Sequence, residues 1–186
     1  MAVAAGIMVP HPPLIVPDVG RGQEILIKDT IKAYQEAAGM AAELKPDTIV
    51  VISPHAVMYA DYFHVSPGKE ARGDFGRFMA PQIGVEAGYD EAFVRELDRL
   101  CGDDGFPMGT EGEREKELDH GTLVPLYFIN QHYRDYKLVR IGGSGLSFAD
   151  HYRAGRYIAR AAENLGRSVF IVASGDLSHK LRGDGP

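Results

Sequence analysis

The stretch Thr48-Ile-Val-Val-Ile-Ser53 (TIVVIS) decides the fold, because an uncharged apolar run of this length is typical of a strand buried on both faces. Upstream, residues 23–44 place apolar side chains on one stripe at helical spacing, and residues 2–9 form another short apolar run. The order strand, helix, strand, with apolar rather than alternating strands, predicts a parallel sheet that helices cover.

The same pattern recurs near the end of the chain. Residues 136–142 (YKLVRIG) precede a predicted helix over residues 148–165, and the apolar strand 168–174 (SVFIVAS) follows before a glycine turn. We therefore expect a single three-layer α/β domain over residues 1–186, with a central, mostly parallel or mixed sheet and helices on both faces.

The middle of the chain is less regular. We expect a short strand at residues 62–66, a loop at 68–78 (GKEARGDFGRF) and a helix near 90–100. The charged run at residues 111–117 (EGEREKE) is typical of a solvated surface, so no function is assigned to it.

Composition narrows the classes of partner. The formal net charge of -6 provides no excess of lysine and arginine for a phosphate backbone, so we expect no nucleic-acid partner. A small molecule fits this composition better, and a homo-oligomer is compatible with it. The single cysteine, Cys101, can form no internal disulfide and is typical of a small packed residue in a reducing cytoplasm.

The apolar N-terminus does not predict a membrane or export segment. It has no basic region at its start and is interrupted by Pro10, Pro12 and Pro13. No stretch reaches the roughly 18 uninterrupted apolar residues that a membrane-spanning helix needs. We expect a cytoplasmic protein without a membrane partner.

Three of the seven histidines follow predicted strands directly or closely: His11 after Val9, His55 after Ser53, and His179 after Ser174. In open α/β sheets, ligands bind beyond the carboxyl ends of the strands. Of the other four, His64, His132 and His151 lie at no such edge, so we expect surface or satisfied core residues there.

His11 and His55 share a local design, because a proline separates each of them from its strand. Proline fixes its own φ and keeps the preceding residue extended, so the backbone that carries each imidazole is stiff, as suits a metal ligand. A proline that merely ends a strand would explain either Pro-His pair taken singly. It would not explain why a histidine follows the proline in both.

Two further segments carry candidate groups. Residues 174–179 (SGDLSH) leave a buried strand through a glycine turn and present His179 in a place that suits a catalytic base. Residues 119–122 (DHGT) open the apolar run LVPLYFI, so His120 lies between a charged loop and buried structure.

Four blocks in this order resemble the signature blocks of the class III extradiol dioxygenase catalytic subunits, the LigB-like superfamily. They are VPHPPLIVPDVG (residues 9–20), ISPHAVMYADYF (52–63), LDHGTLVPLYF (118–128) and ASGDLSHKL (173–181). The resemblance spans nearly the whole chain and is strongest to the Memo-like, AmmeMemoRadiSam-associated branch. It implies a single α/β domain with a mixed sheet.

The resemblance also implies a chemistry. His11 and His55 would bind non-haem Fe(II), His179 would be the catalytic acid-base group, and His120 a second catalytic group lining the pocket. The substrate would be a small aromatic diol of the catechol type, cleaved with O2.

The resemblance further implies a carboxylate that completes a 2-His-1-carboxylate face. In the family this ligand lies near the end of a longer chain, so we expect it beyond Pro186 and the present chain to lack the C-terminal part of the domain. Asp61, Asp119 and Asp176 lie close to the histidines in sequence, but are more simply groups that support a ligand or cap a helix.

Other functions stay open. A zinc-dependent hydrolase, or a Memo-like protein that holds iron, zinc or copper and binds a partner, would use the same His11 and His55. A serine hydrolase is disfavoured, because residues 142–146 (GGSGL) lack the last glycine of G-x-S-x-G. A phosphate or dinucleotide site at residues 143–145 has weak support, since Phe148 replaces the third glycine of G-x-G-x-x-G.

Overall fold

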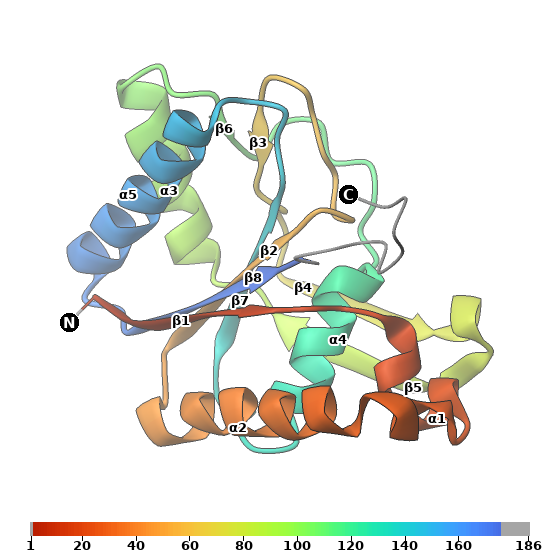
Figure 1. Ribbon diagram of the computed structural model, residues 1–186. Helices are drawn as coiled ribbons and strands as arrows, with labels where there is room; N and C mark the ends of the chain where they lie inside the picture. Colours follow the sequence, from red (N-terminus) through yellow and green to blue (C-terminus); the bar gives the residue numbers. More distant parts are fainter. Residues whose placement is uncertain (1, 176–186) are drawn as a thin grey trace.

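The computed structural model describes residues 2–175 and shows a parallel four-stranded sheet with helices on both faces (Figure 1). This confirms the predicted α/β class. The strand order is β1-β8-β2-β7, with bounds Val3–Val9 for β1, Val169–Ser174 for β8, Thr48–Ser53 for β2 and Lys137–Gly142 for β7. Both predicted strand-helix-strand units thus contribute to one sheet.

β2 is buried in the interior of the sheet, as its composition predicts. It pairs in parallel with β8 on one side and with β7 on the other. Ile49 and Val51 belong to one hydrophobic cluster and Val50 to another. The two clusters lie on opposite faces because successive side chains of a strand alternate.

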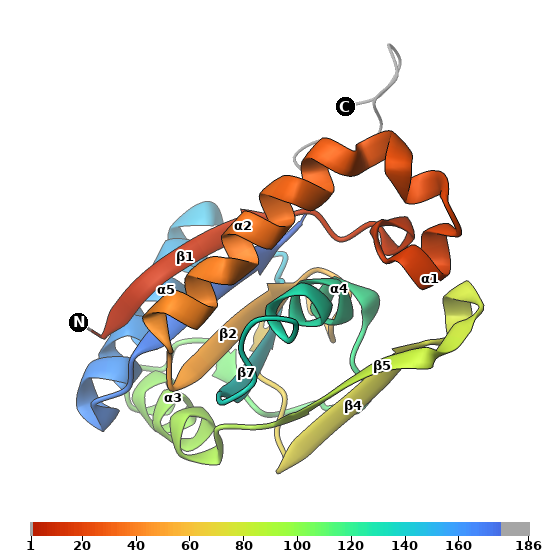
Figure 2. The ribbon, with the colours of Figure 1, turned by 90° about the horizontal axis from the view of Figure 1, so that it is seen from below.

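Helices cover each face of the sheet in pairs (Figure 2). α2 (Lys28–Leu44) packs with α4 (His120–Ile129) on one face, and α3 (Glu91–Asp103) packs with α5 (Phe148–Leu165) on the other. α3 and α5 are amphipathic, whereas α4 is buried along nearly its whole length. α4 therefore begins at the carboxyl edge of the sheet with its first residue, His120, partly buried.

The helix predicted over residues 23–44 begins later than expected. Residues Gln23–Ile27 form a 3-10 segment, and α2 proper starts at Lys28. Ile27 has a non-helical ψ of 30° and separates the two segments. The predicted apolar stripe therefore spans a break in the helix. Before it, a 3-10 turn (Pro13–Ile15) and the short α1 (Pro17–Gly20) continue the chain from β1.

The loop predicted at residues 68–78 was wrong. β4 (Glu70–Phe75) and β5 (Ala80–Gly88) form an antiparallel hairpin there, joined by the 3-10 turn Gly76–Phe78. Ala71 and Phe75 face the core, while charged residues occupy the outward positions, which hid the alternation in the sequence. The short strand expected near residues 62–66 is β3 (Phe63–His64), paired with β6 (Met108–Gly109).

Within residues 2–175, none of the helices combines the length and apolar character that crossing a bilayer requires.

Candidate metal centre

Three histidines meet at the carboxyl edge of the sheet. His11 follows β1, His55 follows β2, and His120 is the first residue of α4. Their nearest ring nitrogens all lie within 4.8 Å of one another. Among the histidine, cysteine and carboxylate side chains of residues 2–175, these three form a group that could share a metal ion.

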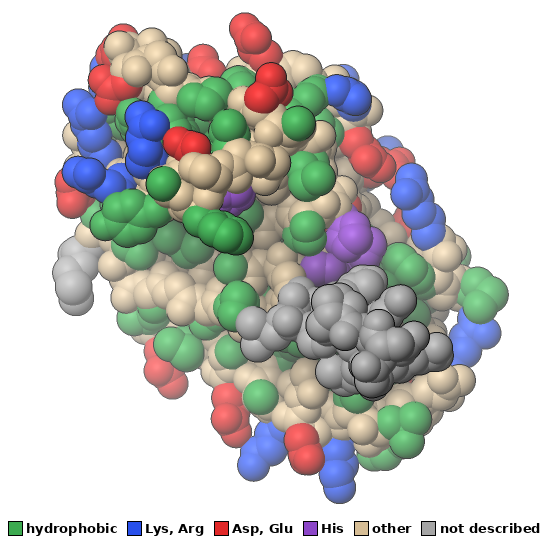
Figure 3. Space-filling model, turned by 45° about the horizontal axis from the view of Figure 1, so that its top comes forward, with side chains coloured by type: hydrophobic (Ala, Val, Ile, Leu, Met, Phe, Trp, Pro, Cys, Tyr) green, Lys and Arg blue, Asp and Glu red, His purple; other side chains and the backbone are tan. Residues whose placement is uncertain are grey.

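The three imidazole rings pack against one another. Nε2 of His11 and Nε2 of His55 are 3.1 Å apart. The ring of His120 lies 4.0 Å from that of His55 and 5.4 Å from that of His11, centroid to centroid. In the space-filling view, histidine side chains are visible at the surface of the molecule (Figure 3).

The hydrogen bonds of His11 fix which nitrogen carries its proton. Ser174, the last residue of β8, donates its hydroxyl proton to the carbonyl of Gly121 at 2.5 Å. The same Ser174 Oγ lies 2.9 Å from Nδ1 of His11 and must therefore accept from it. Neutral His11 thus carries its lone pair on Nε2, which faces Nε2 of His55 at hydrogen-bonding distance and is the atom that would bind a metal.

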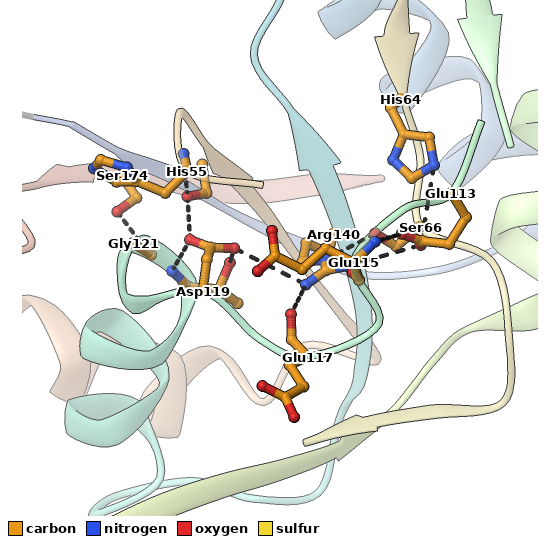
Figure 4. A network of polar contacts seen from close by, with 12 residues as sticks. His55, His64, Ser66, Glu113, Glu115, Glu117, Asp119, Gly121, Arg140 and Ser174 are labelled. Atoms are coloured by element: carbon orange, nitrogen blue, oxygen red, sulfur yellow. Dashed lines mark hydrogen bonds and ion pairs between the residues drawn. The ribbon is translucent and has the colours of Figure 1, made fainter. Parts of the chain in front are cut away.

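Asp119 joins the segments that carry His55 and His120 (Figure 4). Its Oδ1 accepts from Ser53 Oγ at 2.6 Å and from the backbone N–H of Thr122 at 3.0 Å, which makes it the N-cap of α4. Ser53 Oγ in turn accepts from the backbone N–H of His55 at 3.1 Å. The orientations of His55 and His120 are therefore linked through one carboxylate.

A pocket of about 180 Å³ opens beside these histidines. Its polar lining includes Asp74, Arg77, Glu115 and Glu117, and its apolar lining includes Phe78, Leu118 and Leu123. The rings of Phe78 and His120 pack in a T-shaped arrangement, with their centroids 5.5 Å apart. A small molecule in this pocket would contact His55 and His120 directly.

The model of the family "Catalytic LigB subunit of aromatic ring-opening dioxygenase" matches residues 5–186. This chain belongs to the LigB family. It is 39% identical over 186 residues to Protein CA_C1420 of Clostridium acetobutylicum, and 26% identical over 160 residues to a 3,4-dihydroxyphenylacetate 2,3-dioxygenase of Escherichia coli. These matches take in 96% and 83% of this chain, but 40% and 57% of the two relatives, so the chain spans about half of their length.

The donor set fits the metal dependence of the LigB family. Neutral imidazole is a ligand for iron, zinc and copper alike. Two nitrogens bound at right angles, each about 2.1 Å from one ion, would lie about 3 Å apart. The observed 3.1 Å between the Nε2 atoms of His11 and His55 matches that spacing. A metal ion therefore fits between these two side chains.

The other sequence candidates fall in different places. His179 and Asp176 lie outside the described residues, so their predicted roles stay predictions. His132 and His151 are exposed and bonded to Gln35 and Ser147, as expected for surface residues.

His64 differs from the satisfied core residue that was expected. It is buried, but neither ring nitrogen has a hydrogen-bond partner within residues 2–175. Glu113 Oε2 approaches its Nε2 to 4.0 Å, and burial lowers the pKa of the imidazole.

Cys101 is a small packed residue, as expected. The side chain is buried in α3, and burial raises the pKa of its thiol to about 12, so it is no reactive thiol.

Sequence reasoning missed Ser53 and Ser174, which contact the segments of His55 and His11, and the buried Arg140, whose Nη1 lies 4.0 Å from Asp119 Oδ2. The two serines end their strands directly before the site, yet serine at a strand end is too common to predict a role. Arg140 carried a clearer signal, because a charged residue inside the apolar run KLVRIG needs buried partners.

Gly121 lies where the site tolerates no side chain, and Gly121→Ala tests this. A Cβ at this position would lie 2.4 Å from Ser53 Oγ and 3.3 Å from His55 Cδ2. Because Ser53 and His55 would have to move, we expect metal affinity, measured by titration, to fall by about 10- to 100-fold, as for the loss of a residue that orients a ligand.

Gly155→Ala provides the matched control in α5. Apart from the backbone of α5 itself and the neighbouring residues, no atom lies within 4 Å of a Cβ built there. Alanine should therefore raise the free energy of unfolding by about 0.5 to 1 kcal/mol through helix propensity and leave metal affinity unchanged. Wild-type metal affinity in Gly121→Ala would contradict the close packing described for this site.

Proposed function

We propose that the chain forms the metal-binding half of a non-haem Fe(II)-dependent extradiol dioxygenase, which cleaves the ring of a catechol-type substrate with O2. The observation that carries this proposal is the His11–His55 pair, with its nitrogens 3.1 Å apart beside a pocket, in a chain of the LigB family. The name of the Escherichia coli relative supports an aromatic diol as the class of substrate.

His11 and His55 would hold the iron, and the surrounding residues prepare them for it. Ser174 keeps the proton of His11 on Nδ1, and Ser53 fixes the backbone that carries His55. When bound, Fe(II) would supply Lewis acidity toward two adjacent hydroxyl groups and redox chemistry toward O2. A carboxylate outside the described residues would complete this ligand set.

His120 and His179 are proposed as the groups that move protons. An imidazole titrates near neutrality, so it can accept a phenolic proton and return it during ring opening. His120 lines the pocket within reach of a bound ring, and Asp119 holds its backbone at the start of α4. His179 would act from the segment that follows β8.

The shape and lining of the pocket support a small aromatic substrate. Its volume of about 180 Å³ is below the roughly 300–1,000 Å³ of sites for drug-sized ligands, and so suits a single ring. Phe78 and Leu123 offer apolar surface to such a ring, while His55 and His120 offer polar atoms to its hydroxyl groups.

A zinc-dependent hydrolase is the second candidate, and the placement of His120 favours it. His11, His55 and His120 together offer three imidazoles within 4.8 Å, and three histidines with an open fourth position form a known type of catalytic zinc site. A Memo-like role, in which a metal-bearing pocket binds a partner protein, would use the same residues.

Metal analysis of the full-length protein, purified without oxygen, combined with an oxygen-uptake assay on catechols, separates these functions. We expect iron in the protein and equimolar consumption of O2 and catechol, because both oxygen atoms enter the ring-opened product. Zinc without oxygen uptake would refute the dioxygenase and favour the hydrolase. Partner binding that survives loss of the metal would favour the Memo-like role.

A further inference from the structure

Arg140 is buried in the interior although it carries a permanent charge. It lies in the middle of β7 and is 1% exposed. Among the described residues, it is the largest side chain that is fully buried. A guanidinium removed from water is strongly destabilising unless carbonyls and carboxylates surround it. Its partners therefore show what it holds in place.

The partners of Arg140 come from two segments outside β7. Nε donates to Ser66 Oγ at 2.7 Å, in the stretch that follows β3. Nη1 and Nη2 donate to the backbone carbonyls of Glu117 and Glu115, each at 2.6 Å, in the charged run that precedes α4. The segment of residues 113–119, which includes most of this run and ends at Asp119, is named the His120 approach.

Two carboxylates of the His120 approach complete the surroundings. Glu113 Oε2 lies 3.8 Å from Nη2, and Asp119 Oδ2 lies 4.0 Å from Nη1 of Arg140. One planar guanidinium thus meets the His120 approach at Glu113, Glu115, Glu117 and Asp119 (Figure 4). The charged run that the sequence assigned to a solvated surface is anchored from inside the fold.

Asp119 passes this anchoring on to the metal centre. Oδ2 faces Arg140 and accepts from Thr122 Oγ1 at 2.9 Å, while Oδ1 accepts from Ser53 Oγ. Ser53 contacts the backbone of His55, and Asp119 directly precedes His120. A displacement of the guanidinium would therefore reach two of the clustered histidines through a single carboxylate.

We propose that Arg140 is a positioning residue, which sets the geometry of the metal centre by fixing the His120 approach and Asp119 without touching metal or substrate. This inference rests on the metal site of the proposed function, but not on its reaction. Lysine would be a poor replacement, because a single ammonium on a flexible stem cannot donate to Ser66 and to two carbonyls in the same plane.

The test is Arg140→Lys in the full-length protein, with Co²⁺ as the metal probe. We expect Co²⁺ affinity to fall by about 10- to 100-fold, as for other residues that orient ligands, and the visible absorption bands of the bound Co²⁺ to shift. The matched control is Arg99→Lys, since Arg99 on α3 also pairs with two carboxylates, Glu96 and Asp103, but is exposed and lies outside this network. The control should keep the wild-type affinity and spectrum.

Ser66→Ala provides a second variant, in case Arg140→Lys fails to fold. It removes one contact of Arg140 and lies outside the histidine cluster, so we expect a smaller spectral shift in the same direction with the fold intact by circular dichroism. Folded variants with reduced stability but wild-type Co²⁺ affinity and spectrum would overturn the proposal and leave Arg140 a structural residue.

The outcomes also separate this inference from the proposed function. A wild-type protein that binds Co²⁺ but cleaves no catechol in its iron form refutes the dioxygenase and leaves the role of Arg140 to be decided by the spectra. A wild-type protein that binds no Co²⁺ refutes both.

Discussion

His11→Ala in the full-length protein is expected to lower metal affinity by more than about 100-fold and to abolish metal-dependent turnover. Removing a residue that merely orients a ligand already costs about 10- to 100-fold, and here the ligand itself is lost. His11 is buried, and its Nε2 lies 3.1 Å from Nε2 of His55, so the substitution removes one of the two paired nitrogens. Metal content after dialysis and competitive titration with a chelator measure the effect.

His132→Ala is the control for this prediction. His132 is exposed and bonded to Gln35, far from the edge of the sheet that carries the site. It should retain wild-type metal content and activity. Metal retained at full affinity by His11→Ala would show that the ion binds elsewhere.

His120→Ala then distinguishes a ligand from a catalytic group. If His120 only moves protons, the variant keeps its metal and loses turnover. If His120 is the third ligand of a zinc-type site, metal affinity falls together with activity. The ring centroids of His55 and His120 are 4.0 Å apart, so His120 is close enough to serve in either role. One titration of metal affinity distinguishes the two.

Phe170→Ala is expected to lower the free energy of unfolding by about 3 to 5 kcal/mol, the cost typical of a buried phenylalanine. Phe170 lies on β8, in the interior of the sheet, is fully buried and belongs to the cluster beneath α2 and α4. Alanine would leave a cavity that the paired strands on both sides of β8 cannot close. Denaturant unfolding of the metal-free protein measures the loss.

Phe148→Ala makes the same chemical change at the surface. Phe148 opens α5 and is 94% exposed, so its removal should change the free energy of unfolding by less than about 0.5 kcal/mol. Equal losses from the two variants would contradict the burial of β8.

The sequence predicted the parts of the fold whose hydrophobic pattern is local. β2, β7 and β8 appear as apolar runs, and α3 and α5 as amphipathic stretches. The β4–β5 hairpin was missed because its inward positions are filled in part by alanine and glycine, and the outward positions of β4 by charged residues. Such a strand becomes recognisable only through its antiparallel partner, which lies across a turn.

The candidate site was predictable where local sequence determines it. Pro10-His11 and Pro54-His55 follow apolar strands, and parallel strands bring their carboxyl ends to one edge. The contact of Ser174 and the role proposed for Arg140 depend on residues more than 20 positions away, Gly121 for the one and Glu115 for the other. No local pattern contains that information, so those roles emerge only from the assembled sheet.

The strand order β1-β8-β2-β7 has a consequence for synthesis of the protein. β8, the last strand of the described chain, lies between β1 and β2, and its final residue sets the tautomer of His11. On the ribosome, the strands that precede His11 and His55 emerge early but do not pair with each other. They are aligned only when the segment ending at Ser174 has left the exit tunnel and entered the sheet. We therefore expect a metal ion to bind at His11 and His55 only after β8 has entered the sheet.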